Sequence, residues 1–355
     1  MPKSALSRVD ELLEKKPKLD LRDKKILAML SEDSRMPLTA IARKVRMSRD
    51  TVDYRIKRLV ASGIILGFAP QINLGFFGYS TYHVFMVIDT LNEARKNALI
   101  SALSGHPNTR SVMEYHDTWD LEWVLVARSL KEFDTILIEI TKDFKDVINR
   151  KDKLAIIKGL KSIQLPGTLY RESQHNLRKA EKREKSKTAV DETDIELLRA
   201  LSQNSRLSTY EIAKLTGISP DAVGYRIKKM VAGGIIYGFT ILTNLSALNY
   251  HLYTFCINVR TFDVHNEMRF REFITQNPNI LRAVKVLGDW DLLIYITADS
   301  QESFHQTFKE TQQNLREVIA DYQTWAAYKE HVYNNFPPAI ADAQLKKARK
   351  SGNGG

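Results

Sequence analysis

The chain has 355 residues, a hydrophobic fraction of 43% and a formal net charge of +11. This length allows two to four domains with cores of their own, and no run approaches the ~18 uncharged apolar residues of a membrane helix. A single cysteine, Cys256, excludes an internal disulfide and a cysteine-based metal site.

The positive charge is concentrated outside the segments that look globular. Residues 1–18, 159–188 and 339–355 carry about +2, +5 and +3, so the rest of the chain holds only about +1. Basic stretches of this kind either attract phosphates without sequence specificity or solvate exposed segments. Charge alone does not decide between these two functions.

An internal repeat organises the sequence. Residues 20–158 align with residues 191–329 at a constant offset of 171, without a gap and with roughly 30% identity. The block DTVDYRIKRLVASGIILGF, from Asp50, matches DAVGYRIKKMVAGGIIYGF, from Asp221. Two copies of a long unit are too few for a solenoid. The chain is therefore interpreted as a tandem duplication of one module.

Each copy opens with a pattern of three short helices. Apolar side chains have helical spacing over residues 20–33, a second helix follows Pro37, and Ser48 is a good N-cap for a third helix that ends near Gly63. The second copy repeats the pattern with Ser219 as the third N-cap. Three short helices with a tight turn before the last predict a helix-turn-helix. A β-branched run after each third helix predicts a strand that leaves it.

The second half of each copy predicts a small sheet domain. From Tyr79 the order is strand, helix, two strands joined by a turn at Asp117–Thr118, helix, and a last strand over 153–158, and the second copy repeats it from Tyr250. This βαββαβ order is ferredoxin-like, an antiparallel sheet with helices on one face. Because the open face needs cover, we expect the two sheets to pair within the chain, face to face or edge to edge, and the chain to form a homo-oligomer.

The predicted fold class is therefore α+β, with two copies of a winged-type helix-turn-helix domain followed by a ferredoxin-like βαββαβ domain. The predicted segments are a basic N-terminal tail (1–18), helix-turn-helix domain 1 (19–70), sheet domain 1 (76–160), a charged linker (161–189), helix-turn-helix domain 2 (190–241), sheet domain 2 (247–334) and a basic C-terminal tail (335–355).

The third helices carry the side chains expected to bind double-stranded DNA. The exposed N-terminal part of such a helix enters the major groove, where arginine and lysine suit guanine edges and phosphates and tyrosine bonds phosphate or stacks. An alternative role for Arg55 and Arg226 is an ion pair with aspartates of the first helix. The expected DNA-binding residues are Ser48, Arg49, Thr51, Tyr54, Arg55, Lys57 and Arg58 in the first copy, and Ser219, Asp221, Tyr225, Arg226, Lys228 and Lys229 in the second.

The sequence also contains several short motifs: D-x-x-D in each first helix, Ser34–Arg35 and Ser205–Arg206, YRIK after each N-cap serine, the G-I-I-x-G-F exit, and GDWD at 288–291. With the patterns above, these motifs resemble the Lrp/AsnC family of feast/famine regulators. The resemblance covers nearly all of both copies, and the departure is the duplication, because family members usually carry one copy. It implies a DNA-binding transcription regulator of the cytoplasm of a prokaryotic-type cell, with dimerisation by the sheet domains and, in many members, an amino-acid effector between subunits.

The resemblance also implies a candidate effector site at the turn between the middle strands of each sheet domain. In the second copy this turn contains Gly288, Asp289 and Asp291, whose backbone amides suit a carboxylate and whose acids suit an ammonium. In the first copy Asp117 replaces the glycine, which hinders a close approach of the backbone, and Asp120 is the matching acid. The alternative is a plain hairpin turn with solvated aspartates.

Two other functions are compatible with the same pattern. The fold also resembles siroheme decarboxylases, whose histidine and basic residues would have to converge on a tetrapyrrole carboxylate. The candidates here are His83, His116, His251 and His331, but His83 and His116 have no histidine at the matching position of the second copy. The basic third helices favour a regulator without enzymatic activity. A further possibility is a ligand-sensing module with inactive DNA-binding domains. The sequence contains no motif for a nucleophile triad, a phosphate loop or a metal cluster, so no cofactor or metal is expected.

Overall fold

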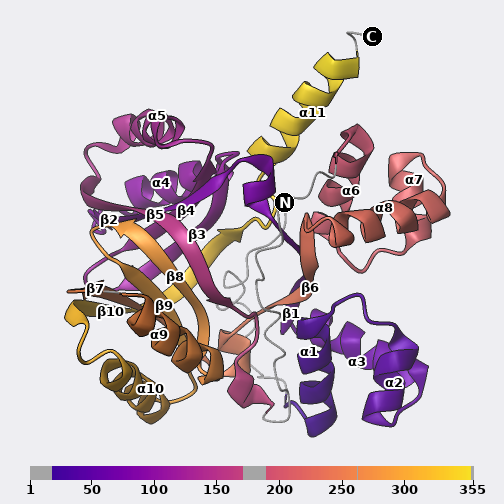
Figure 1. The fold of residues 1–355 in the computed structure, drawn as a ribbon, viewed down its shortest axis with the longest axis horizontal. Helices are drawn as coiled ribbons and strands as arrows, with labels where there is room; N and C mark the ends of the chain where they lie inside the picture. The colour runs from indigo at the N-terminus through magenta and orange to yellow at the C-terminus, as the bar shows by residue number, and fades with distance from the viewer. Residues whose placement is uncertain (1–17, 171–188, 262, 353–355) are drawn as a thin grey trace.

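The computed structural model describes residues 18–170, 189–261 and 263–352 (Figure 1). Residues 1–17 of the predicted N-terminal tail and 171–188 of the predicted linker lie outside these ranges. The fold is α+β: two helix-turn-helix heads lie beside each other at one side of a barrel (Figure 1). Within the described ranges, no helix has both the length and the apolar character needed to cross a membrane.

Each head is the predicted trio of helices. Asp20 and Asp191 begin the first helices with capping boxes, and Ser48 and Ser219 cap the third ones by accepting a backbone N–H. Head 1 consists of α1 (Leu21–Glu32), α2 (Leu38–Val45) and α3 (Arg49–Ala61), and head 2 of α6 (Glu192–Gln203), α7 (Thr209–Thr216) and α8 (Pro220–Ala232).

A two-stranded ribbon joins the heads. The strands that leave them, β1 (Ile65–Ile72) and β6 (Ile236–Thr243), pair with each other antiparallel. Short 3-10 turns, η1 (Leu74–Phe77) and η4 (Ser246–Leu248), then lead into the barrel. The ribbon thus connects each head to its own sheet domain and to the other head.

The sheet domains have the predicted βαββαβ order. Module 1 consists of β2 (Ser80–Ile88), α4 (Glu93–Gly105), β3 (Thr109–His116), β4 (Leu121–Ala127), α5 (Leu130–Thr141) with a 3-10 turn η2 (Lys142–Phe144), and β5 (Ile148–Ser162). Module 2 consists of β7 (His251–Val259), α9 (Val264–Gln276), β8 (Ile280–Gly288), β9 (Leu292–Ala298), α10 (Gln301–Asn314) and β10 (Ile319–Tyr333).

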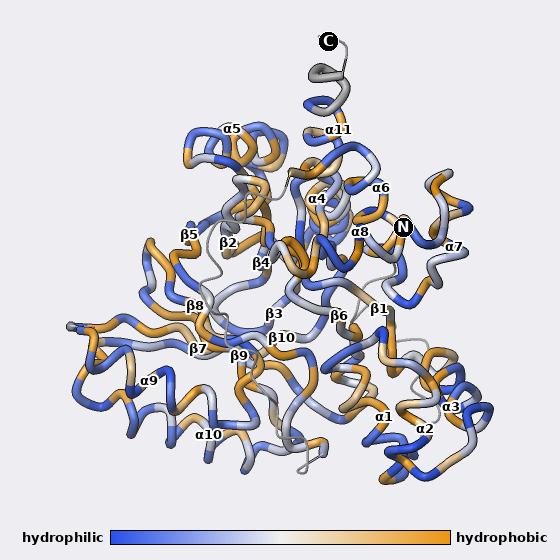
Figure 2. The backbone as a smooth tube through the Cα atoms, turned by 45° about the vertical axis from the view of Figure 1, so that its right-hand side comes forward, coloured by the Kyte–Doolittle hydropathy of each residue, from blue (hydrophilic) through white to orange (hydrophobic). Residues whose placement is uncertain are grey.

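The two modules close one eight-stranded barrel. Its strand order is β10-β3-β4-β2-β5-β8-β9-β7, so the modules join edge to edge at β3·β10 and at β5·β8. The four helices lie outside, and the tubes of α9 and α10 are mostly hydrophilic on view (Figure 2). Aromatic side chains from both modules fill the interior, among them Phe85, Trp119, Trp290 and Trp325. The predicted intramolecular pairing is confirmed.

The last strand of each module is longer than predicted. The strand expected over 153–158 extends over all of β5, because β5 pairs with β2 on one side and with β8 on the other. The apolar pattern marks only the middle of β5, around the buried Leu154, whereas the residues on either side are mostly exposed.

Each head packs on the sheet module of the opposite copy. The core of head 1 contains Tyr250 and Leu281 of the second copy, and the core of head 2 contains Phe77 and Tyr79 of the first. The duplication therefore behaves as a crossed pair and not as two separate units in a row.

Two segments predicted as a linker and a tail differ from that description. Leu165 and Leu169, next to the 3-10 turn η3 (Gly167–Leu169), are buried in the core of head 1. Ile340 and Leu345, in the helix α11 (Pro338–Gly352), are buried in the core of head 2. Both segments carry a net positive charge, but the apolar residues within them pack into the cores of the heads.

Candidate nucleic-acid interface

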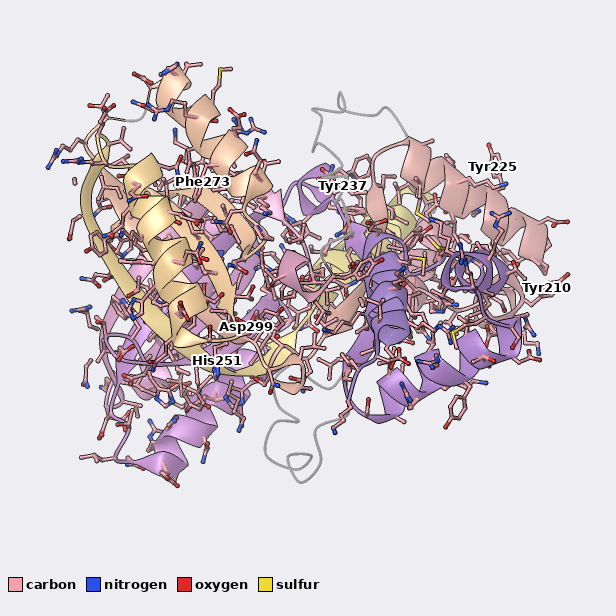
Figure 3. All side chains as sticks on the ribbon, turned by 90° about the horizontal axis from the view of Figure 1, so that it is seen from below. Tyr210, Tyr225, Tyr237, His251, Phe273 and Asp299 are labelled. Carbon is pink, nitrogen blue, oxygen red and sulfur yellow. The ribbon has the colours of Figure 1, made fainter. Side chains whose placement is uncertain are left out.

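The third helices α3 and α8 present the same exposed side chains on both heads. Tyr54 and Tyr225 are 66% and 69% exposed, although tyrosine usually buries its ring. Lys57 and Lys228, one turn further along, are also exposed. Tyr225 lies at the outer surface of the heads, on the side away from the barrel (Figure 3).

The arginines that follow the two tyrosines form ion pairs with the first helix. Arg55 donates to Asp20 at 2.7 Å and to Asp23 at 2.8 Å, and Arg226 donates in the same way to Asp191 and Asp194. These hydrogen bonds raise the pKa of both guanidinium groups. Of the two roles that the sequence left open, this geometry favours the ion pair.

Several other predicted DNA-binding side chains also have partners within their own head. The hydroxyls of Ser48 and Ser219 accept the backbone N–H of Thr51 and Ala222, and the hydroxyl of Thr51 contacts that of Ser48 at 2.7 Å. Arg58 donates to Asp23, and Lys229 donates to the carbonyl of Ala189. Lys57 forms an i,i+4 ion pair with Asp53, while Arg49 and Asp221 lie exposed in the first turns of α3 and α8.

Sequence reasoning missed one exposed aromatic residue. Tyr210 in α7 is 71% exposed and lies with Tyr225 on the outer surface of the heads (Figure 3). The matching residue of head 1 is Thr39. The signal that could have identified it is a tyrosine that lies off the apolar face of the second helix.

A reciprocal contact fixes the two heads to each other. Ser34 and Ser205 are fully buried, and their hydroxyls meet at 2.8 Å. Arg35 donates to the carbonyls of Ser205 and Leu207, and Arg206 donates to that of Ser34. The serine–arginine pairs noted in the sequence therefore join the heads, and together with the β1·β6 ribbon they hold α3 and α8 in one arrangement.

The acids of the candidate effector turns are used by the fold. Asp120 accepts the backbone N–H of Ile88 at 2.8 Å, and Asp291 accepts that of Val259 at 2.9 Å. Each of these carboxylates ties its turn to the end of a neighbouring strand. This engagement disfavours a direct contact between either acid and an effector ammonium.

The first residue of each turn has a positive φ. Gly288 has φ +147°, and a Cβ there would lie 2.3 Å from the carbonyl oxygen of Lys153. Asp117 occupies the matching position with φ +97°, a backbone conformation that L-residues rarely adopt. Asp117 and Asp289 are both exposed. Glycine is needed at 288 because the turn closes against β5.

The four candidate histidines are not all in one place. His83 is buried and contacts Glu122 at 2.6 Å, whereas His251 is exposed at the start of β7. His331 contacts Glu114, and His116 stacks on Tyr328, which also donates to Glu114. Of the four, only His116 and His331 belong to one cluster, at the β3·β10 junction.

A buried acid in this part of the barrel predicts a pH-dependent stability. Burial raises the pKa of Glu330 to about 7, although a hydrogen bond from Ser111 opposes the shift. The folded protein therefore keeps a proton that the unfolded chain loses near pH 4.5, so stability is lost as the pH rises through about 7. In the wild type the free energy of unfolding should fall by up to about 3 kcal/mol as the pH rises from 4.5 to 8, and we expect Glu330→Gln to remove this fall. Denaturant unfolding at both pH values checks this, and parallel pH profiles of the two proteins would contradict it.

Comparisons with known proteins agree with this architecture. A family model for a winged helix-turn-helix DNA-binding domain matches residues 19–65, and one for an AsnC-type helix-turn-helix domain matches residues 190–231. The leucine-responsive regulatory protein of Rhizobium meliloti (strain 1021) is 31% identical over 116 residues, which are 32% of this chain and 74% of that protein. The HTH-type transcriptional regulator LrpB of Bacillus subtilis (strain 168) is 27% identical over a stretch that covers 40% of this chain and 90% of LrpB.

Solved structures match nearly the whole chain. The match to the crystal structure of the siroheme decarboxylase NirDL covers 94% of this chain and 100% of the NirDL chain, with a TM-score of 0.59 and 12% sequence identity. At this identity the likeness establishes the shared tandem fold. The similarity to the regulator from R. meliloti over most of its length, with a helix-turn-helix match in both copies, shows that this chain is a tandem-duplicated member of the Lrp/AsnC family.

Proposed function

We propose that the protein is a sequence-specific transcription regulator that binds double-stranded DNA through α3 and α8. One observation carries the proposal: both third helices expose a tyrosine and a lysine, Tyr54 with Lys57 and Tyr225 with Lys228. Side chains of these types bond phosphates and base edges. Because the heads are joined, the two helices are offered to one DNA duplex as a pair.

Selection of DNA fragments by the full-length protein tests this function. We expect a set of related sites to be enriched from random duplexes, and binding to weaken as salt rises, because lysine–phosphate contacts release counterions. Failure to retain any duplex at low salt would contradict the proposal.

Removal of one lysine gives a sharper prediction. Lys57→Ala is expected to weaken binding to all duplexes and to lower the salt slope by about one, because one phosphate contact is lost. Lys142→Ala, at an exposed site of η2 at the end of α5, removes the same charge outside the heads and serves as the control. Equal effects of the two variants on titrations at several salt concentrations would contradict a specific role for Lys57.

An amino-acid effector is a finer part of the same proposal. The carboxylate of Asp291 already accepts the N–H of Val259, so the turn residues that remain for a ligand are Gly288 and Asp289. Calorimetric titration of the full-length protein with single amino acids tests this, and the absence of binding by any of them would contradict it.

The similarity to NirDL over the full length favours one alternative function, an enzyme that acts on a tetrapyrrole. His116 and His331 share a cluster with Tyr328 and Glu114 at the β3·β10 junction, where such chemistry would be sought. Titration of the protein with an iron-uroporphyrin III analogue decides between the two functions. A saturable change in the visible spectrum would support the enzyme, and an unchanged spectrum would support the regulator.

A further inference from the structure

The interior of the barrel contains a carboxylate that both modules hold. Glu122 of module 1 is 1% exposed and is hydrogen-bonded to His83 and Tyr115 of the same module. Tyr295 of module 2 adds a hydrogen bond of 2.8 Å. A buried carboxylate is tolerated only when such partners replace its hydration. Module 2 therefore supplies part of what makes Glu122 acceptable.

The matching positions of the other module could not build this site. At the offset of 171, Leu293 stands in place of Glu122, and Val124 stands in place of Tyr295. A barrel made of two copies of module 1 would bury two Glu122 carboxylates in one core, and neither would receive a tyrosine from its partner. Like charges in such a low-dielectric interior repel strongly.

The β3·β10 junction also contains a buried acid of module 1 that depends on side chains of module 2. Glu114 of module 1 is 4% exposed and receives hydrogen bonds from Tyr328 and His331 of module 2, in addition to an ion pair with its own Lys96. These contacts hold the pKa of Glu114 at about 2, against the effect of burial. In module 1 the residues that match Tyr328 and His331 are Ile157 and Leu160, which donate no side-chain hydrogen bond.

At the β5·β8 junction the acid and the lysine of the module have exchanged positions relative to the β3·β10 junction. Glu267 of module 2 pairs with Lys158 of module 1 at 2.6 Å and with its own Lys285 at 3.7 Å. Glu267 and Lys285 occupy the positions that match Lys96 and Glu114. In a barrel made of two copies of module 2, the lysine at 285 would face His331 in place of an acid.

A buried lysine adds a further contact between unlike modules. Lys161, at the end of β5, is 7% exposed and donates to the carbonyls of Ile274 and Asn277 at the C-terminal end of α9. Val332 matches Lys161 in the second copy. Pairing of module 2 with itself would leave these carbonyls without the ammonium group that satisfies them.

From these contacts we infer that the two βαββαβ modules have become specific for each other: each accepts the unlike module and rejects a second copy of itself. The partner that fits each module surface is thus the other half of the same chain. This inference is independent of DNA binding. In the closed barrel both edges of each module are already paired, so closed chains can assemble further only through surfaces other than the sheet edges.

A chain cut between its two copies tests the inference directly. A protease site is placed between Tyr170 and Ala189, and the halves carry tags of different mass. After cleavage, the complex is unfolded, refolded and weighed by native mass spectrometry. We expect pairs of one N-terminal and one C-terminal half, whereas random pairing would put about half of the complexes into like pairs. Like pairs in such amounts would overturn the inference.

A double-mutant cycle on the intact chain decides the question even if the halves fail to refold. Tyr295→Val and Glu122→Leu each install the residue of the other copy. We expect Tyr295→Val to lower the folding equilibrium constant by more than about tenfold in the wild type, but by a much smaller factor when Glu122→Leu is present. Equal effects in both backgrounds would show that Tyr295 does not act through Glu122, and would overturn the inference.

Discussion

Replacement of Asp23 by alanine is expected to destabilise head 1 by about 3 kcal/mol, because it leaves two arginines without a buried partner. Asp23 is fully buried and accepts hydrogen bonds from Arg55 and Arg58. It also closes the capping box of α1 by accepting the backbone N–H of Asp20. Hydrogen exchange of peptides from head 1 measures the effect, as faster exchange throughout α1 and α3.

The second head and the barrel supply the controls. Asp194 is equally buried but accepts from Arg226 alone among the arginines, since Lys229 donates to a backbone carbonyl. Asp194→Ala is therefore expected to cost head 2 less, about 2 kcal/mol. All four tryptophans lie in the sheet modules, so their fluorescence reports whether the barrel stays folded. A larger loss in head 2 than in head 1 would contradict the prediction.

The local parts of the fold could be predicted from the sequence, because their causes are local. Ser48 caps α3 through a contact three residues away, and the repeat doubles every such signal. The crossed packing of the heads could not be predicted in this way. It depends on contacts such as that of Tyr250 with the core of head 1, for which periodicity contains no information.

The candidate site shows the same division. The sequence identified Tyr54 and Tyr225 because both lie on the outer face of a predicted third helix. It could not assign Arg55, since phosphate and the carboxylate of Asp23 attract a guanidinium equally well. The partner of the turn acid Asp120, the N–H of Ile88, lies 32 residues away in the chain, so no local pattern shows that the fold already uses this carboxylate.

We expect the preferred DNA site to be unequal in its two halves, with the half bound by head 1 specified more strongly. Identical recognition helices favour half-sites related by two-fold symmetry. Here the helices differ in their N-terminal halves, the part of a recognition helix that contacts bases. Each lost base contact is worth roughly 1–3 kcal/mol of discrimination. The differing pairs are Arg49 and Pro220, Thr51 and Ala222, and Asp53 and Gly224.

The structure indicates what each helix can still do. Arg49 is exposed at the start of α3, whereas Pro220 begins α8 and has no donor for a guanine. Head 2 keeps Tyr225 and Lys228 and adds the exposed Tyr210, so its contacts should be mainly with phosphates. We therefore expect Arg49→Ala to erase the preference in one half-site, and the matching Pro220→Ala to change little.

Exchange of the two recognition helices provides the decisive measurement. A chain in which residues 48–59 and 219–230 are swapped should select the same site with its strong and weak halves reversed relative to the heads. Lys142→Ala is the control, because it changes an exposed residue of η2, outside both recognition helices. The stoichiometry of the complex must be measured in parallel, since two chains around one two-fold axis restore symmetry to the whole site. Equal information in both halves of a site bound by one chain, unaltered by the swap, would contradict the prediction.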